Sequence, residues 1–254
     1  MRKLLRVLES VLPFIIVILI QASIYGLFHF ALQAITGVSD FPGDVEKTIQ
    51  VISVAISGLF FYFWYQKISI FQPKVSLAKV LTTKNIFLLM LMGIGCQFFA
   101  SGLMSILQPL FEKIFADYDK AVGSLFSGSI FMTVIYIVLV APVVEELIFR
   151  GVTMIKLSRS LPFAAANIIQ AALFGIFHMQ LLQGIYGFAI GLLFGFVCHR
   201  FKTLTASILL HIFINASAFL MFLIPASYGI FVAMIVFGGG LLIISLKDIM
   251  KEQF

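Results

Sequence analysis

Charged residues are scarce in this chain. Asp, Glu, Lys and Arg make up 11% of its 254 residues, against about 25% in ordinary soluble domains. In contrast, 61% of the residues are hydrophobic and the mean hydropathy is +1.12. This composition excludes a soluble globular domain. We expect an all-α, polytopic membrane protein, because the apolar runs have the length of membrane-spanning helices.

Cysteine is also rare. Cys96 and Cys198 are the only two, and both lie in apolar segments, so the sequence offers neither a cysteine metal site nor a disulfide framework. We expect both to be packing residues. The net charge of +6 does not indicate a nucleic-acid partner, because cytoplasmic loops of membrane proteins carry an excess of Lys and Arg.

Apolar windows long enough to cross a bilayer, about 20 residues each, predict eight transmembrane helices. The N-terminus begins like a signal peptide, but the apolar run from Ser10 to Thr36 is too long for one and has no clear cleavage site. We therefore expect a retained first span. The eight windows are residues 10–36, 48–66, 85–107, 125–157, 162–181, 183–199, 203–224 and 227–246.

The basic residues predict the orientation. With the N-terminus inside, all of the 17 Lys and Arg residues except Lys47, Lys113 and Lys120 fall at cytoplasmic ends or in cytoplasmic loops. An even number of spans then returns the C-terminus to the same side. We expect an integral protein of a bacterial cell membrane with both termini in the cytoplasm and the active site open to that side.

Residues 108–121 alternate apolar and charged side chains at helical spacing. This pattern predicts an interfacial helix on the outer face of the membrane, although an ordinary polar loop is the alternative. Farther along, Gly187, Gly191 and Gly195 recur every four residues. They form a small-residue edge that predicts close approach of another helix.

Two adjacent carboxylates and an arginine interrupt the fourth apolar window. Ionisable residues inside a membrane usually face the protein interior, pair with one another and mark a functional site. In a helix, Glu146 and Arg150 are i,i+4 neighbours in the favoured order, whereas Glu145 is rotated by about 100°. Glu146 is then structural and Glu145 is a candidate general base. An ion pair that only stabilises helix contacts is the alternative.

Two further helices carry histidines. Phe174 and His178 lie one helical turn apart in the fifth window, and His211 and Asn215 do so in the seventh. A lone buried histidine is more often a satisfied core residue than a catalyst. However, three apolar helices would each bury polar groups at a cost unless these groups met in one shared site. At about 1.5 Å per residue, the three groups lie at roughly 13 to 24 Å from the cytoplasmic ends of their helices.

These residues resemble the motifs of the CAAX protease and bacteriocin-processing (CPBP) family of intramembrane glutamic endopeptidases, which includes the type II CAAX prenyl endopeptidases. The family pattern is EExxxR, FxxxH and HxxxN on successive helices, and no position of it is missing here. The resemblance implies a catalytic core at 125–224. It leaves 1–124 as N-terminal helices with the interfacial helix, and 225–254 as a final helix and cytoplasmic tail.

The resemblance also implies a mechanism without a metal or other cofactor. Glu145 with His178 would activate a water, and His211 with Asn215 would stabilise the oxyanion. Arg150 would hold Glu146, and Phe174 would support the site. The implied partners are the lipid bilayer and a membrane-associated peptide or protein substrate, which need not be prenylated. The sequence does not indicate an oligomeric state.

Three other functions stay open. Two histidines and a carboxylate could bind zinc, although the zinc-protease signature His-Glu-x-x-His is absent. A non-enzymatic membrane scaffold or bacteriocin-immunity protein is a second alternative, against which the intact motifs argue. A transporter would also place charges inside the membrane, often in repeated halves, but the sequence has one such cluster and no internal repeat.

Overall fold

The computed structural model describes residues 2–69, 75–126 and 128–252, and these residues form helices and connecting loops with no strand. The predicted all-α class is therefore confirmed. The elements in chain order are α1 (Arg2–Thr36), α2 (Gly43–Ser69), α3 (Leu77–Val80), α4 (Thr83–Leu107), η1 (Gln108–Leu110), α5 (Glu112–Leu125), α6 (Ile130–Ile135), η2 (Tyr136–Val140), α7 (Ala141–Glu146), η3 (Leu147–Met154), α8 (Ile155–Ser158), α9 (Phe163–Phe177), α10 (Leu181–Phe201), α11 (Leu204–Ala218), η4 (Phe219–Leu223) and α12 (Tyr228–Lys251).

Each of the eight predicted windows corresponds to a helix. Within the described residues, seven helices are long and apolar enough to cross a membrane, and the fourth of these runs unbroken through α6, η2, α7, η3 and α8. The remaining window is α9, an apolar helix of 15 residues. The polytopic architecture is thus confirmed, with the qualification that α9 is shorter than a typical span.

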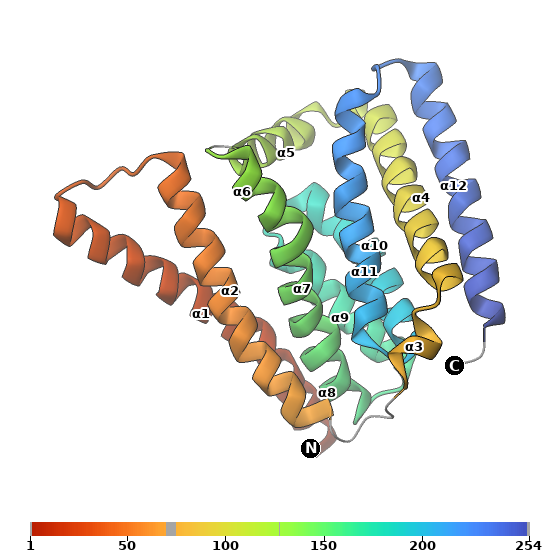
Figure 1. Ribbon diagram of the computed structural model, residues 1–254, viewed down its shortest axis with the longest axis horizontal. Helices are drawn as coiled ribbons and strands as arrows, with labels where there is room; N and C mark the ends of the chain where they lie inside the picture. Colours follow the sequence, from red (N-terminus) through yellow and green to blue (C-terminus); the bar gives the residue numbers. More distant parts are fainter. Residues whose placement is uncertain (1, 70–74, 127, 253–254) are drawn as a thin grey trace.

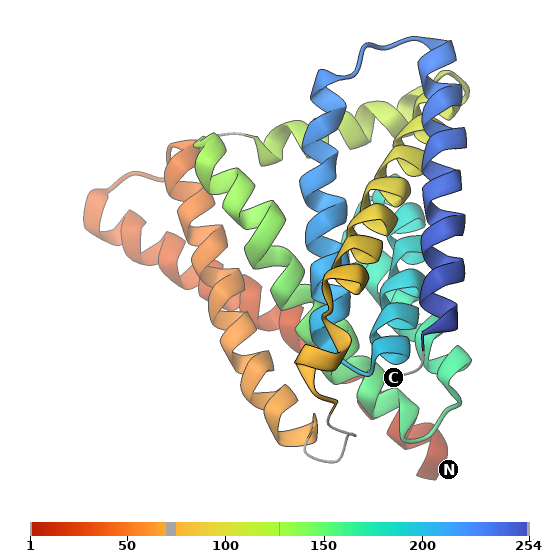
Figure 2. The same cartoon turned by 45° about the vertical axis from the view of Figure 1, so that its right-hand side comes forward.

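The helices run side by side between two ends of the molecule (Figure 1). Both chain termini lie at one end, together with α3 and α8. This end holds the loops predicted to be basic and cytoplasmic, although Lys74, one of those basic residues, lies outside the described residues. Helix α2 packs along α6, α7 and η3, and the C-terminal part of α1 points away from the other helices, whereas α4 and α12 lie together along their length (Figure 2).

The helix predicted at residues 108–121 is present as η1 and α5, so the alternative of a polar loop is wrong. It runs across the end opposite the termini (Figure 1). Phe115 is its buried residue, and the ring of Tyr118 lies 6.3 Å from that of Tyr186 on α10. Burial raises the pKa of Tyr118, and its hydrogen bond with Tyr186 partly offsets this rise. Contact of α5 with a membrane surface stays a prediction.

Helices α9 and α10 form a tight hairpin. A Cβ atom on Gly191 would lie 3.2 Å from the Cα atom of Ala171, and one on Gly195 would lie 1.8 Å from Oδ1 of Asn167. Larger side chains on this edge of α10 would therefore force the two helices apart. The small-residue edge predicted from the glycine spacing is confirmed, and its partner is α9.

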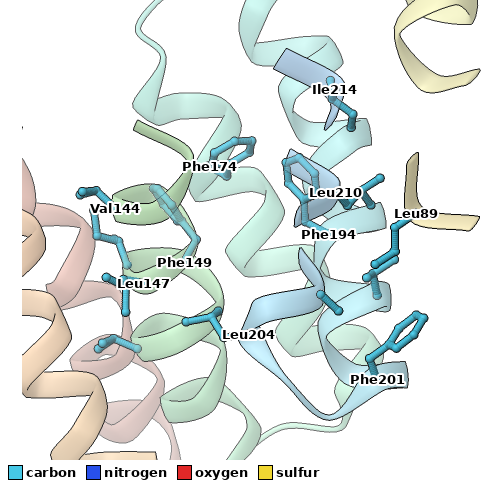
Figure 3. Close-up of a cluster of buried hydrophobic side chains, with 14 of the residues drawn as sticks. Leu89, Val144, Leu147, Phe149, Phe174, Phe194, Phe201, Leu204, Leu210 and Ile214 are labelled. Atoms are coloured by element: carbon cyan, nitrogen blue, oxygen red, sulfur yellow. The ribbon is translucent and has the colours of Figure 1, made fainter. Parts of the chain in front are cut away.

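The main hydrophobic core lies around the span that carries Glu145, Glu146 and Arg150 (Figure 3). Phe149 from η3, Phe174 from α9 and Phe194 from α10 are at most 2% exposed, and Leu210 from α11 is fully buried beside them. Between membrane helices such a cluster stabilises the fold by van der Waals packing, because the lipid tails are as apolar as the side chains themselves. The elements that carry the three motifs are thus held together by one apolar cluster.

Candidate active site

The span that carries the two glutamates is not a regular α-helix. Two π-helical segments, η2 and η3, flank the short α-helix α7. Pro142, in the first turn of α7, has no N–H to donate to the carbonyl four residues earlier, which accounts for the altered hydrogen bonding just before it. Single π turns inside longer helices are frequent at functional sites.

Glu146 and Arg150 form a fully buried ion pair. Nη1 of Arg150 lies 2.8 Å from Oε1 of Glu146, and both side chains are 0% exposed. Nη2 of Arg150 donates to the carbonyl oxygen of Gly191 at 3.1 Å. The guanidinium also lies 4.5 Å and 4.9 Å from the ring centroids of Phe174 and Phe194. The pairing predicted from the i,i+4 spacing is present, and two aromatic rings enclose it.

His211 of α11 lies between the two carboxylates. Its Nδ1 is 3.0 Å from Oε1 of Glu146, and its Nε2 is 3.7 Å from Oε2 of Glu145. The imidazole stacks on Phe194, with ring centroids 4.4 Å apart. Since an ionised carboxylate only accepts hydrogen bonds, Nδ1 of His211 is the donor to Glu146.

The two glutamates differ in exposure. Oε1 of Glu146 accepts hydrogen bonds from both Arg150 and His211, while Oε2 is buried without a hydrogen-bond partner. The Glu145 side chain is 15% exposed, against 0% for Glu146. Its closest ionic partner, Nε2 of His211, is beyond hydrogen-bond distance. Glu145 is therefore the more accessible carboxylate, as the sequence predicts.

His178 caps the C-terminal end of α9. Its Nδ1 lies 2.8 Å from the carbonyl oxygen of Phe174. A carbonyl oxygen only accepts, so Nδ1 carries the proton and, in the neutral imidazole, Nε2 keeps its lone pair. The next residue, Met179, has φ +54° and ends the helix. In the described part of the chain, no ion pair joins His178 to either glutamate.

Asn215 lies one helical turn after His211 on α11. Its Nδ2 donates to the carbonyl oxygen of Ile137 at 2.8 Å, and Ile137 belongs to the π-helical segment η2. The structure thus brings Glu145, Glu146, Arg150 and His211 into one cluster beside Phe174. Asn215 contacts the span that carries the glutamates through the backbone carbonyl oxygen of Ile137. His178 lies one turn after Phe174, at the end of α9.

Several contacts of the cluster escape sequence reasoning. Phe194 touches both Arg150 and His211, yet it is one of 29 phenylalanines and carries no signal of its own. Gln170 is fully buried and donates to the same Gly191 carbonyl oxygen as Arg150. It could have been found, because it is a polar residue one turn before Phe174 in an otherwise apolar helix.

The fold and the cluster define a polytopic membrane protein with an ionisable site enclosed by its helices. Among the described residues, no group of three or more His, Cys, Asp or Glu side chains is arranged to hold a metal ion. The carboxylates lie on α7, the arginine on η3, and the histidines at the end of α9 and on α11.

Comparisons with known proteins agree with this class. Residues 126–217, which hold all three motifs, match the family model for type II CAAX prenyl endopeptidase Rce1-like proteins. The resemblance predicted from the motifs is thus confirmed, and it supports a membrane protease.

A relative named "Putative membrane peptidase YdiL", from Bacillus subtilis (strain 168), is 32% identical over 87 residues. The alignment covers 34% of this chain and 36% of that relative, so the chain spans about a third of the relative's length. No solved structure matches the chain.

Proposed function

We propose that this protein is an intramembrane endopeptidase that hydrolyses a peptide bond in a membrane-associated peptide or protein. The observation that carries the proposal is the position of His211 between Glu145 and Glu146, with Glu146 held by Arg150. Ionisable groups inside a membrane are expensive unless they serve a function. The family match over the segment that contains this cluster supports proteolysis as that function.

Glu145 is the proposed general base. It takes a proton from water, the water oxygen bonds to the carbonyl carbon of the substrate, and the carbonyl π electrons move onto its oxygen. The electrons on this oxygen then re-form the carbonyl, and the C–N bond breaks as the amine leaves with the proton from Glu145, which leaves a carboxyl group on the other product. His178 supports the first step, because the lone pair of its Nε2 can accept a hydrogen bond from the same water. In this proposal one water bridges His178 and Glu145, which form no ion pair among the residues that the structure describes.

His211 and Asn215 are the proposed donors to the oxyanion. For Nε2 to donate while Nδ1 donates to Glu146, both ring nitrogens of His211 must carry a proton. Nε2 of His211 is 3.7 Å from Glu145 and makes no hydrogen bond there. It is therefore available to a substrate oxygen, and a well-placed donor of this kind contributes about 10²–10³ in rate. Nδ2 of Asn215 has two N–H groups, so one can keep its bond to the Ile137 carbonyl oxygen while the other donates to the oxyanion.

Glu146, Arg150 and Phe174 are proposed positioning residues. Arg150 fixes Glu146, Glu146 fixes Nδ1 of His211, and Phe174 covers the guanidinium while its carbonyl oxygen fixes the tautomer of His178. His178 and His211 are thus each oriented by a neighbour that does not itself react. Such fixed geometry matters, because small misplacements of a catalytic group can reduce the rate by about 10²-fold.

The test compares the membrane-associated peptides of cells that make the unmodified protein with those of cells that make Glu145→Gln. We expect peptides that require the carboxylate, at equal amounts of inserted protein, because the substitution removes the base and keeps the volume. Identical peptide profiles would contradict an enzyme and favour a scaffold or bacteriocin-immunity protein.

The zinc-dependent alternative makes a different prediction. The proposed chemistry needs only protein groups and water, so we expect purified protein to keep its activity after exhaustive chelation and to contain no stoichiometric zinc by elemental analysis. Activity that is lost with chelator and restored by zinc would reassign His178 and His211 to metal ligation.

A further inference from the structure

A cavity of about 670 Å³ lies at the end of the molecule that holds both termini. The ends of α8 and α10 and the beginning of α11 contribute to its walls, and Arg150 and Gly151 of η3 border it. Its volume falls within the range of about 300–1,000 Å³ that is usual for ligand pockets. The proposed catalytic groups Glu145, His178, His211 and Asn215 are not among its lining residues. It therefore adjoins the proposed catalytic site through Arg150 but does not contain the proposed reacting groups.

The lining of this cavity is basic. It includes Arg200 and Lys202 besides Arg150, and it contains no Asp or Glu. Arg150 is neutralised by Glu146. Arg200 donates to the backbone carbonyl oxygens of Ile249, Met250 and Glu252 at the C-terminal end of α12, whose partial negative charge of about half a unit offsets only part of its positive charge. An anion is the ligand that this wall would attract.

The beginning of α11 adds to the positive potential. Leu204 is the first residue of this 15-residue helix, and both it and its N-cap Thr203 line the cavity. Helix N-termini carry a partial positive charge and unpaired backbone N–H groups, so they bind phosphate and carboxylate groups readily. Ser158 and Tyr65 supply hydroxyl groups on the other walls.

We propose that this cavity binds the phosphate group of an anionic phospholipid. Apolar residues, among them Leu161 and Phe163, line it beside the cations, which suits a headgroup attached to its glycerol and the beginning of its acyl chains better than a free ion. In the topology predicted from the basic residues this end faces the cytoplasm, where anionic lipids are enriched and where basic pockets between membrane helices are known headgroup sites. This assignment does not rest on the proposed protease activity.

Purified protein in neutral detergent provides the test. Its unfolding temperature is followed while dioleoylphosphatidylglycerol, dioleoylphosphatidylcholine or inorganic phosphate is added. We expect phosphatidylglycerol to raise the unfolding temperature at the lowest concentration, phosphatidylcholine to act far more weakly, and inorganic phosphate to act only at much higher concentration, because it gains no apolar contact.

Two matched pairs of variants locate the binding. Lys202 has φ +51°, which asparagine tolerates, so Lys202→Asn should fold and should weaken phosphatidylglycerol binding about fivefold, as expected for one basic residue near a charged membrane surface. Lys247→Asn, in a residue on α12 that does not line the cavity, should leave the affinity unchanged. Ser158→Asp should weaken binding and Ser158→Asn should not, because the two differ mainly in charge.

Several results would overturn the assignment. Equal responses of Lys202→Asn and Lys247→Asn would remove the site from this cavity. A full response to inorganic phosphate at lipid concentrations would identify a soluble phosphate as the ligand in place of the lipid. Equal responses to the two lipids would contradict the requirement for net negative charge. The unfolding temperature of each variant without lipid verifies that it is folded.

Discussion

Replacing the two adjacent glutamates one at a time separates chemistry from stability. Glu146 is 0% exposed and its Oε1 is shared by Arg150 and His211. In Glu146→Gln the guanidinium keeps its charge in an apolar enclosure without a carboxylate. Removing one partner of a buried pair typically costs about 3–5 kcal/mol. Because a glutamine amide oxygen still accepts one hydrogen bond, we expect the lower end of this range, about 3 kcal/mol.

Glu145→Gln should behave differently. Its side chain is 15% exposed and its closest ionic contact, to His211, is 3.7 Å long. We expect a loss of stability below about 1 kcal/mol, the usual range for a weak, partly exposed pair, but complete loss of proteolysis. For a chain of this size, about 1 kcal/mol corresponds to about 2–4 °C in unfolding temperature. Glu146→Gln should thus unfold about 6–12 °C lower than the unmodified protein, and Glu145→Gln close to it.

Thermal unfolding in detergent and cleavage of a membrane-associated peptide measure the two effects on the same preparations. A double variant, Glu146→Leu with Arg150→Met, is the control, because replacing both charges by apolar groups of similar size is often neutral. It should recover most of the stability and none of the activity. Equal loss of activity with unchanged stability in both single variants would refute this division of roles.

Three further predictions use matched substitutions. Phe194→Leu removes the ring between Arg150 and His211 and should slow proteolysis up to about tenfold. Phe201→Leu, at an equally buried position of α10, should lower stability by a similar amount and leave the rate unchanged. Equal rates of the two variants in a cleavage assay would exclude a positioning role for Phe194. Gly195→Ala places a Cβ 1.8 Å from Oδ1 of Asn167 and should lower stability by about 1–3 kcal/mol. Thermal unfolding measures this loss. Gly240→Ala is the control, because its new Cβ would meet no neighbouring residue within 4 Å. With Cys96 and Cys198 replaced, cysteines at Ser76 and Ser158 should react with an impermeant thiol reagent only in opened cells, and cysteines at Ser39 and Ala116 in intact cells; labelling of Ser158→Cys in intact cells would reverse the topology.

The sequence predicts the helices well because membrane helices are specified locally. Twenty apolar residues form a span whatever their neighbours are, so the windows agree with the observed elements to within a few residues at most boundaries. The Glu146–Arg150 pair is predictable for the same reason, since its geometry is internal to one helix. The glycine edge of α10 is also visible in the spacing, but its partner α9 is not.

Contacts between helices are harder to predict. The motifs indicate that Glu145, His178 and His211 share a site, yet the spacing does not say which histidine lies against which carboxylate. The structure places His211 against both glutamates, while His178 is held by the carbonyl oxygen of Phe174. The position of His178 depends on where α9 ends. The helix ends at Met179, whose backbone is left-handed. Because residues other than glycine rarely adopt this conformation, the sequence does not predict it.

The π-helical segments explain why the depths of Glu145 and His211, counted from the cytoplasmic ends of their helices, differ although the two side chains lie close together. The count assumes a rise of about 1.5 Å per residue and puts Glu145 roughly 5 Å deeper than His211, although their side chains lie 3.7 Å apart. Segment η3 lies between Glu145 and the end of α8, and eight residues are wound there in wider turns. A π turn holds more residues than an α turn, so it advances less along the axis for each residue, and Glu145 lies closer to the level of His211. The same turns bring Arg150 under the rings of Phe174 and Phe194 while keeping its pair with Glu146. The irregular winding that defeats the depth estimate is therefore part of what assembles the site.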